Sequence, residues 1–314
     1  MILTRSECAD FLRSHDRFAI VTHRRPDGDT VGSAATLCRG LRQLGKVAHI
    51  LENPEITAKY RPLHEGLTKP WVEEGDLLIS VDVASPNMLP DAFRVLEDAI
   101  TLRIDHHGTA TPFTEHELVD PKAAACGEIL YDVLTEMGAQ LDKAMAEALY
   151  TAVSTDTGCF RYANTTAHSL MTAAACAEAG GNLYAINQAI FETNSFRKLK
   201  IQSWITENTE FLAEGRIAIC ALPKAVEEQI GVTEDDMENI SGFPRSIEGV
   251  KIAATLRESA GGAVKVSVRA VPEYDAAAVC AQFGGGGHRG AAGCTVKLPL
   301  AEAAKAVAEA MPQM

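Results

Sequence analysis

The sequence predicts an α/β protein, with a mostly parallel sheet and flanking helices in its N-terminal part and a smaller α/β domain after it. Two observations support this prediction. Short apolar runs alternate with longer segments of helical periodicity over the first 190 residues, and polar groups follow several of these runs. From about Gly215 the character changes, and strand-like runs follow one another more closely. We therefore expect two domains.

The composition is that of a folded protein with a substantial core. Of the 314 residues 46% are hydrophobic, and no run of 18 apolar residues indicates a transmembrane helix. The N-terminus has no apolar signal segment and the eight cysteines include no C-x-x-C pair, so we expect reduced thiols, a cytoplasmic location and no membrane partner. A formal charge of −13 argues against duplex DNA as a partner, though not against a small phosphorylated substrate.

In the N-terminal domain, residues 1–190, the apolar runs predict strands at 18–22, 47–51, 76–84 and 99–104. Helical periodicity predicts helices at 30–44, 123–137, 142–153, 165–180 and 182–193. Gly45 is expected to end the first of these helices. The segment 196–212 is expected to be a connecting helix within a linker at 191–212.

The C-terminal domain is predicted to span residues 213–314. Strands are expected at 216–222, 250–256, 264–270 and 294–298, and helices at 224–230, 276–282 and the alanine-rich end of the chain. The glycine-rich stretch 283–293 lies before the last strand. Taken alone, its four consecutive glycines would indicate a flexible loop.

Acidic and imidazole residues gather where the predicted N-terminal strands end. His23, Asp27 and Asp29 lie between the first strand and its helix, in a Pro-Asp-Gly-Asp segment that would also form a turn on its own merits. Asp82 lies near the end of the 76–84 run, where a cation, a hydrogen-bond network, exposure at the strand end or an N-cap role would each explain a carboxylate. The carboxyl ends of parallel strands share one edge of a sheet, so we expect these groups to meet.

The same pattern recurs farther along the chain. Asp105, His106 and His107 follow the 99–104 run, and Asp156 follows the helix at 142–153, where it would either cap the helix or face the same site. Carboxylates mixed with imidazoles, without cysteine, suit Mn²⁺ or Mg²⁺ better than structural zinc. Several carboxylates with few ligands each indicate two metal ions about 3.5–4 Å apart and phosphoester hydrolysis as the chemistry.

The order of these residues resembles the four motifs of the DHH phosphoesterase superfamily. The motifs are His23-x-x-x-Asp27-Gly-Asp29, Asp82, Asp105-His106-His107 and Asp156. The stretch 284–293 and the strand 265–269 resemble the DHH-associated C-terminal domain. Length and layout resemble the group of nanoRNase/pAp phosphatases, bifunctional oligoribonucleases that also act on adenosine 3′,5′-bisphosphate.

This resemblance implies a role for each matched residue. It assigns one metal to His23 and Asp27, the other to Asp29, His106 and Asp156, and a bridging role to Asp82. His107 would lie beside the substrate phosphate, with Asp105 orienting its neighbours. Substrate binding is implied for Arg269, His288, Gly285, Gly286 and Gly287, with Arg257 and Lys265 as weaker candidates. Ala270 departs from the serine typical of relatives, which puts one phosphate contact in doubt.

The resemblance also implies the cofactors, the substrates and their place in the fold. It implies two Mn²⁺, with Mg²⁺ or Co²⁺ as alternatives, and an active site in the cleft between the domains. Very short single-stranded RNA and adenosine 3′,5′-bisphosphate are the implied substrates, and a homodimer is the implied assembly. The alternative function is a phosphodiesterase for linear or cyclic dinucleotides such as pApA, pGpG or cyclic di-AMP. A pyrophosphatase, a catalytically silent nucleotide sensor and a structural protein fit the motifs less well.

Overall fold

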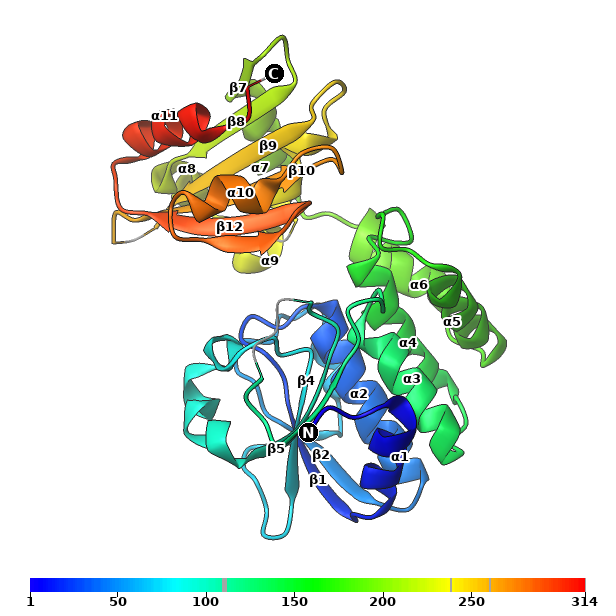
Figure 1. Ribbon diagram of the computed structural model, residues 1–314. Helices are drawn as coiled ribbons and strands as arrows, with labels where there is room; N and C mark the ends of the chain where they lie inside the picture. Colours follow the sequence, from blue (N-terminus) through cyan, green and yellow to red (C-terminus); the bar gives the residue numbers. More distant parts are fainter. Residues whose placement is uncertain (109–111, 238, 260, 314) are drawn as a thin grey trace. The chain divides into compact units, whose positions relative to one another are not determined.

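The chain forms two compact units in the computed structural model, which describes residues 1–108, 112–237, 239–259 and 261–313. The first unit is Met1–Thr193 and the second is Asn194–Met314 (Figure 1). Each unit has its own sheet and its own core. The α/β class predicted for both parts of the chain is confirmed.

The first unit is built on a six-stranded sheet in which every neighbouring pair is parallel. Its strands are β1 (Arg17–Val21), β2 (Val47–Leu51), β3 (Thr68–Lys69), β4 (Leu77–Val81), β5 (Ile100–Asp105) and β6 (His116–Val119). Their spatial order is β3-β2-β1-β4-β5-β6. The direction of winding reverses between β1 and β4, and such a reversal opens a crevice at the carboxyl ends of the strands.

Helices and irregular segments bury both faces of this sheet. The helices are α1 (Arg5–Arg13), α2 (Gly28–Gln43), α3 (Cys126–Met137), α4 (Lys143–Asp156), α5 (Ala167–Glu178) and α6 (Leu183–Asn187), with a π-helical turn at Gln188–Glu192. Phe18 and Ile20 of β1 pack with Leu41 of α2 on one face. On the other face, Ala19 and Val21 belong to a second cluster. Burial on both sides explains why the strands appear as continuous apolar runs.

Two glycines set the approach of α2 to α4. A Cβ on Gly32 would lie 2.4 Å from the carbonyl oxygen of Ala148 and 2.8 Å from the nitrogen of Ala152. A Cβ on Gly28 would lie 2.3 Å from the side chain of Thr155. Only glycine allows two helix backbones to pack this closely. The N-terminus of α2 is therefore held against the end of α4.

The second unit has a mixed six-stranded sheet. Its strands are β7 (Thr209–Leu212), β8 (Ile217–Leu222), β9 (Ile252–Glu258), β10 (Val264–Ala270), β11 (Gly286–His288) and β12 (Ala291–Val296). The order is β11-β12-β10-β9-β8-β7, with β8 and β9 parallel and the other neighbours antiparallel. Its helices are α7 (Phe196–Glu207), α8 (Lys224–Ile230), α9 (Glu234–Met237), α10 (Ala276–Ala281) and α11 (Leu300–Ala310).

The prediction of a single connecting helix at 196–212 is wrong at its C-terminal end. Helix α7 ends at Glu207, and Thr209–Leu212 pairs antiparallel with β8. Ile201 and Ile205 are fully buried with Cys220 and Leu222, so one face of α7 belongs to the core of the second unit. The glycine-rich stretch is also not loop throughout, because Gly286–His288 pairs with β12. Within the described ranges, no helix is both long enough and apolar enough to cross a bilayer.

Candidate metal centre

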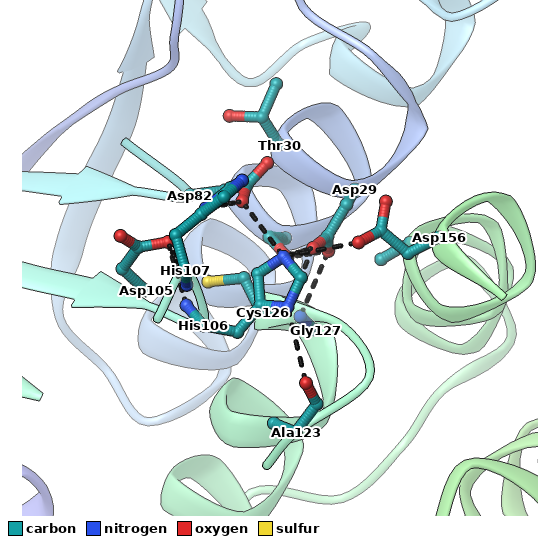
Figure 2. A network of polar contacts seen from close by, with 12 residues as sticks. Asp29, Thr30, Asp82, Asp105, His106, His107, Ala123, Cys126, Gly127 and Asp156 are labelled. Atoms are coloured by element: carbon teal, nitrogen blue, oxygen red, sulfur yellow. Dashed lines mark hydrogen bonds and ion pairs between the residues drawn. The ribbon is translucent and has the colours of Figure 1, made fainter. Parts of the chain in front are cut away.

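The eight predicted residues of the first unit meet at the carboxyl edge of its sheet. His23 follows β1, Asp82 follows β4, and Asp105 is the last residue of β5. The remaining members are Asp27 and Asp29 at the start of α2, His106 and His107 after β5, and Asp156 at the end of α4. Figure 2 shows His106 between Asp29, Asp82 and Asp156. Five separate strand or helix ends thus supply one cluster.

The cluster contains two sets of ligand atoms that share Asp82. In the first set, His23 Nε2 lies 3.5 Å from Asp27 Oδ1 and 3.4 Å from Asp82 Oδ2. In the second, His106 Nε2 lies 3.6 Å from Asp29 Oδ2 and 3.2 Å from Asp156 Oδ2. Asp82 Oδ1 lies 3.5 Å from the same His106 nitrogen. The two oxygens of one carboxylate therefore face two different imidazoles.

Main-chain carbonyls orient both imidazoles. The Nδ1 of His23 lies 2.7 Å from the carbonyl oxygen of Arg24, and the Nδ1 of His106 lies 3.3 Å from that of Ala123. A carbonyl oxygen only accepts, so each Nδ1 carries the proton, and each Nε2 is directed at the carboxylates. Neutral imidazoles held in this way are common metal ligands.

Asp29 is held at the N-terminus of α3. Its Oδ2 accepts from the backbone N–H of Cys126 (2.7 Å), and its Oδ1 accepts from the N–H of Gly127 (3.1 Å) and from the Ser33 hydroxyl (2.9 Å). The side chain is fully buried. The unpaired N–H groups of a helix start favour a negative charge, so Asp29 is fixed in position before any ligand binds.

Asp105 and His107 form a separate pair beside the shared carboxylate. The Oδ1 of Asp105 accepts from the backbone N–H groups of His106 (2.8 Å) and His107 (3.2 Å), and it lies 2.8 Å from His107 Nδ1. His107 Nδ1 is also 3.4 Å from Asp82 Oδ1. Asp105 is thus placed to orient its two neighbours.

Asp82 occupies a strained and electrostatically demanding position. Its φ of +58° lies in the left-handed region. Residues other than glycine rarely adopt this conformation, and those that do are often found at functional sites. Its Oδ1 is buried without a hydrogen bond. A buried carboxylate oxygen of this kind requires positive charge, and a divalent cation beside the two imidazoles would provide it. The donor set therefore fits Mn²⁺ or Mg²⁺.

The electrostatics of the cluster favour positive charge at its centre. Burial lowers the pKa of His106, but Asp156 and Asp82 outweigh it and raise that pKa to about 12. Burial likewise lowers the pKa of His23, and the carboxylates of Asp27 and Asp82 raise it well above its usual range. Burial raises the pKa of Asp156 to about 6. Protons and metal cations are therefore alternatives for balancing the same carboxylates.

The predicted substrate residues lie on the second unit. In the register of its sheet, Arg269 is opposite Ala291, which is opposite His288, so Arg269 and His288 share one face, separated by β12. Lys265 lies on the same face of β10, because side chains two and four residues apart point the same way. Arg257 instead forms a bidentate ion pair with Glu227 (2.7 and 3.0 Å).

The glycines beside these residues have a structural role of their own. A Cβ on Gly285 would lie 2.3 Å from the carbonyl oxygen of Gly293, and one on Gly287 would lie 2.6 Å from that of Ala291. Gly287 also has a φ of +141°. Gly286 has open space around it. The close approach of the chain to β12 therefore requires glycine at 285 and 287.

A fourth histidine–carboxylate group is already neutralised. His49, Glu73 and Asp76 lie close together at the amino-terminal side of β4. Arg17 pairs with Glu73 (2.9 Å) and Asp76 (3.3 Å), and Lys69 pairs with Glu73 (2.6 Å). Two cations already balance the two carboxylates, so we assign no metal to this group.

Two asparagines of the centre had no sequence signal. Asn53 donates to the main-chain carbonyl of His23, and Asn164 donates to that of Asp156. Each partner is a main-chain oxygen, and the bond joins residues that are 30 and 8 positions apart, respectively. No local pattern of residue types could have revealed these contacts.

Comparison with known proteins gives matches over both units. The family model of the DHH family, N-terminal domain, matches residues 17–153, and that of the DHHA1 domain matches residues 216–313. The chain is 34% identical over 297 residues to the bifunctional oligoribonuclease and PAP phosphatase NrnA of Thermus thermophilus, covering 93% of this chain and 88% of that protein. A Bacillus subtilis protein of the same name is 26% identical over 290 residues, covering 90% of each.

The fold also matches a solved structure. An exopolyphosphatase-related protein from Bacteroides fragilis superposes with a TM-score of 0.84 at 23% identity, covering 98% of this chain and 94% of that one. At this identity the likeness concerns the fold alone.

Proposed function

We propose a specific substrate range for this chain, which belongs to the DHH family of phosphoesterases and hydrolyses phosphoester bonds. It cleaves very short single-stranded oligoribonucleotides and converts adenosine 3′,5′-bisphosphate to AMP. The names of relatives that share most of the chain's length support this range. The charge of −13 supports it too, because short substrates need few phosphate contacts.

The observation that carries the proposal is the position of Asp82 between two imidazoles. We assign one divalent cation to His23, Asp27 and Asp82. A second is assigned to Asp29, His106 and Asp156, with Asp82 shared between both. Asp82 is the carboxylate that faces the imidazoles of both ligand sets. We propose Mn²⁺ as the metal, with Mg²⁺ and Co²⁺ as alternatives. Two such cations supply charge stabilisation for the phosphoryl group and activation of water near neutral pH.

His107 is the proposed proton donor toward the substrate. Burial lowers its pKa, but the carboxylates of Asp105 and Asp82 outweigh burial and raise it. A raised pKa favours the protonated imidazole, which is the form that can donate to a phosphoryl or leaving oxygen. Asp105 fixes the ring through Nδ1, so the ring is oriented before substrate arrives.

Residues of the second unit are proposed to bind the nucleotide. The guanidinium of Arg269 suits a bidentate contact with phosphate, and His288 lies on the same face of the sheet. Backbone N–H groups at Gly286 and Gly287 suit close contact with phosphate oxygens. Gly285 would contribute by close approach of its chain, because its own N–H donates to the carbonyl of Cys280 (2.9 Å). We expect less from Arg257, because Glu227 already occupies its guanidinium, and Lys265 is a peripheral candidate.

The proposal is tested by Mn²⁺-dependent hydrolysis of a substrate panel at fixed salt. The panel contains a 5′-phosphorylated RNA dinucleotide, a long RNA, adenosine 3′,5′-bisphosphate, cyclic di-AMP and pyrophosphate. We expect turnover of the dinucleotide and the bisphosphate, with the long RNA spared. Preference for the cyclic dinucleotide would replace the proposed range with the alternative one. The Asp82→Ala protein, purified in parallel, reveals any contaminating nuclease.

A further inference from the structure

We infer that Asn53 and Asn164 are positioning residues, one for each of the two metal positions. The inference rests on the two positions proposed above. Neither side chain is placed to ligate a metal itself, since each directs its amide nitrogen at a carbonyl. What they share is a donated hydrogen bond to the main chain of a ligand residue.

Asn53 braces the first position. It follows β2 and is 3% exposed. Its Nδ2 donates to the carbonyl oxygen of His23 (3.0 Å) and to the hydroxyl of Thr22 (3.0 Å), while its Oδ1 accepts from the N–H of Glu55 (3.0 Å). The end of β1 is thereby tied to the end of β2. The main chain of His23 is held from one side, and its ring is held by the Arg24 carbonyl from the other.

Asn164 braces the second position. Its Nδ2 donates to the carbonyl oxygens of Asp156 (3.1 Å) and Ala124 (3.2 Å). Asp156 is the last residue of α4, where carbonyl groups have no partner within the helix. Ala124 belongs to the loop before α3. One amide therefore joins a ligand-bearing helix end to a different segment.

That loop and the first turn of α3 position the other two ligands of the second set. The carbonyl of Ala123 holds the ring of His106, and the N–H groups of Cys126 and Gly127 hold Asp29. Asn164 consequently connects the segments that carry or orient all three ligands of this set. A shift of the loop relative to α4 would change the distance between His106 and Asp156, which is 3.2 Å.

The backbone after Asp156 gives the hydrogen bond from Asn164 a second role. Gly158, Cys159 and Phe160 have φ values of +57°, +57° and +60°. A run of left-handed backbone conformations is unfavourable for residues other than glycine. Such a run persists only where surrounding contacts hold it. Asn164 lies just beyond this run and bonds back to Asp156, so it closes the turn that the strained residues begin.

A simpler explanation is that both asparagines serve only local structure. Asn53 would then cap a turn after β2, and Asn164 would cap the end of α4. Under that explanation, loss of either amide lowers stability but affects the two metal positions alike. Under our inference, loss of each amide lowers the metal affinity at one position and leaves the affinity at the other unchanged. Metal binding by the substrate-free protein separates the two explanations.

The experiment measures Mn²⁺ binding by the metal-stripped full chain, using calorimetry and electron paramagnetic resonance. Asn53→Ala and Asn164→Ala are compared with the unmodified protein. We expect each variant to lower the affinity for one of the two Mn²⁺ ions about 10–100-fold, the range typical for partners that orient metal ligands. Repeating the measurement in His23→Ala and His106→Ala backgrounds assigns the position. Asn53→Ala should add no loss where His23 is already gone, and Asn164→Ala none where His106 is gone.

Two aspartate variants test the donor itself. Asn53→Asp and Asn164→Asp keep the side-chain volume, remove the N–H donors and add negative charge. By charge alone they would strengthen cation binding, so selective weakening in these variants identifies the lost hydrogen bond as the cause. They also keep the test decisive if an alanine variant fails to fold.

Asn182→Ala is the matched structural control. Asn182 caps α6 in the same unit by accepting from Ala185, away from the ligands. Its loss should lower the melting temperature and leave both Mn²⁺ affinities unchanged. Equal weakening of both positions by Asn53→Ala or Asn164→Ala, or no weakening by the alanine and aspartate variants, would overturn the inference. Failure of the unmodified protein to bind Mn²⁺ would instead overturn the proposed metal positions.

Discussion

At the scale of single residues, the centre depends most on Asp82. Its two carboxylate oxygens face His23 (3.4 Å) and His106 (3.5 Å), and its left-handed φ directs it into the cluster. Its backbone N–H donates to the carbonyl of Ile104 (2.9 Å), a contact that any residue other than proline can keep. The side chain can therefore be changed without removing the strand from the sheet.

We predict that Asp82→Ala abolishes Mn²⁺-dependent turnover while the fold is retained. Loss of a shared ligand should lower the affinity for both cations, by more than the roughly 10–100-fold expected for an orienting partner. Activity, Mn²⁺ titration and circular dichroism on one preparation would check this. Retained activity, or loss of one Mn²⁺ alone, would contradict the shared role of Asp82.

A second residue-scale prediction concerns pH. The carboxylates raise the pKa of His23 and His106. In the metal-free protein each of these rings therefore carries a second proton, on Nε2, near neutral pH. Mn²⁺ must displace those protons, and its apparent affinity should therefore rise between about pH 6 and about pH 8. Calorimetry in buffers of different ionisation enthalpy would measure the proton release. An affinity independent of pH, without proton release, would show that protons and Mn²⁺ do not compete.

At the scale of elements, the contact between α2 and α4 sets the spacing of the second metal position. Asp29 is in the first turn of α2 and Asp156 ends α4, and Gly32 lets the two backbones meet. A change at Gly32 would thus alter the metal position through the helices that carry its ligands.

We predict that Gly32→Ala destabilises the protein by about 1–3 kcal/mol, as overpacking of a core usually does. The added Cβ meets the backbone of Ala148 and Ala152, which cannot move aside as a flexible side chain would. Urea unfolding of the metal-free protein would measure the change, and Mn²⁺ binding should weaken as well. Gly242→Ala is the control, because its Cβ would meet nothing within 4 Å. Similar results for both variants would argue against a close-packing role for Gly32.

Burial explains which elements the sequence revealed. The central strands β1, β2, β4 and β5 are apolar on both faces and were predicted within a few residues. The edge strands β3 and β6 were missed, because they are short and include polar residues such as His116 and Glu117. The metal candidates were found because most of them follow the predicted strands directly. Asn53 and Asn164 were not found, because each donates to a main-chain carbonyl, and every residue type has such a carbonyl.

At the scale of the whole molecule, the proposed roles divide between the two units. All eight candidate residues of the metal centre belong to Met1–Thr193, while Arg269, His288 and the glycine-rich stretch belong to Asn194–Met314. Each unit has a separate core, so a substitution on the face of one sheet should leave the other intact. Substrate affinity and metal affinity should therefore be separable by mutation.

Arg269→Ala is predicted to separate them. Loss of a charged hydrogen bond to phosphate should raise KM for a dinucleotide about 10–100-fold, from about 1.5–3 kcal/mol of binding, with both Mn²⁺ affinities unchanged. Steady-state kinetics and Mn²⁺ titration of one preparation would measure both quantities. Arg257→Ala serves as the comparison on the neighbouring strand β9, where Glu227 already pairs with the arginine. If both substitutions raised KM equally, general positive charge rather than a specific Arg269 contact would account for binding, and an unchanged KM in Arg269→Ala would remove this residue from the substrate site.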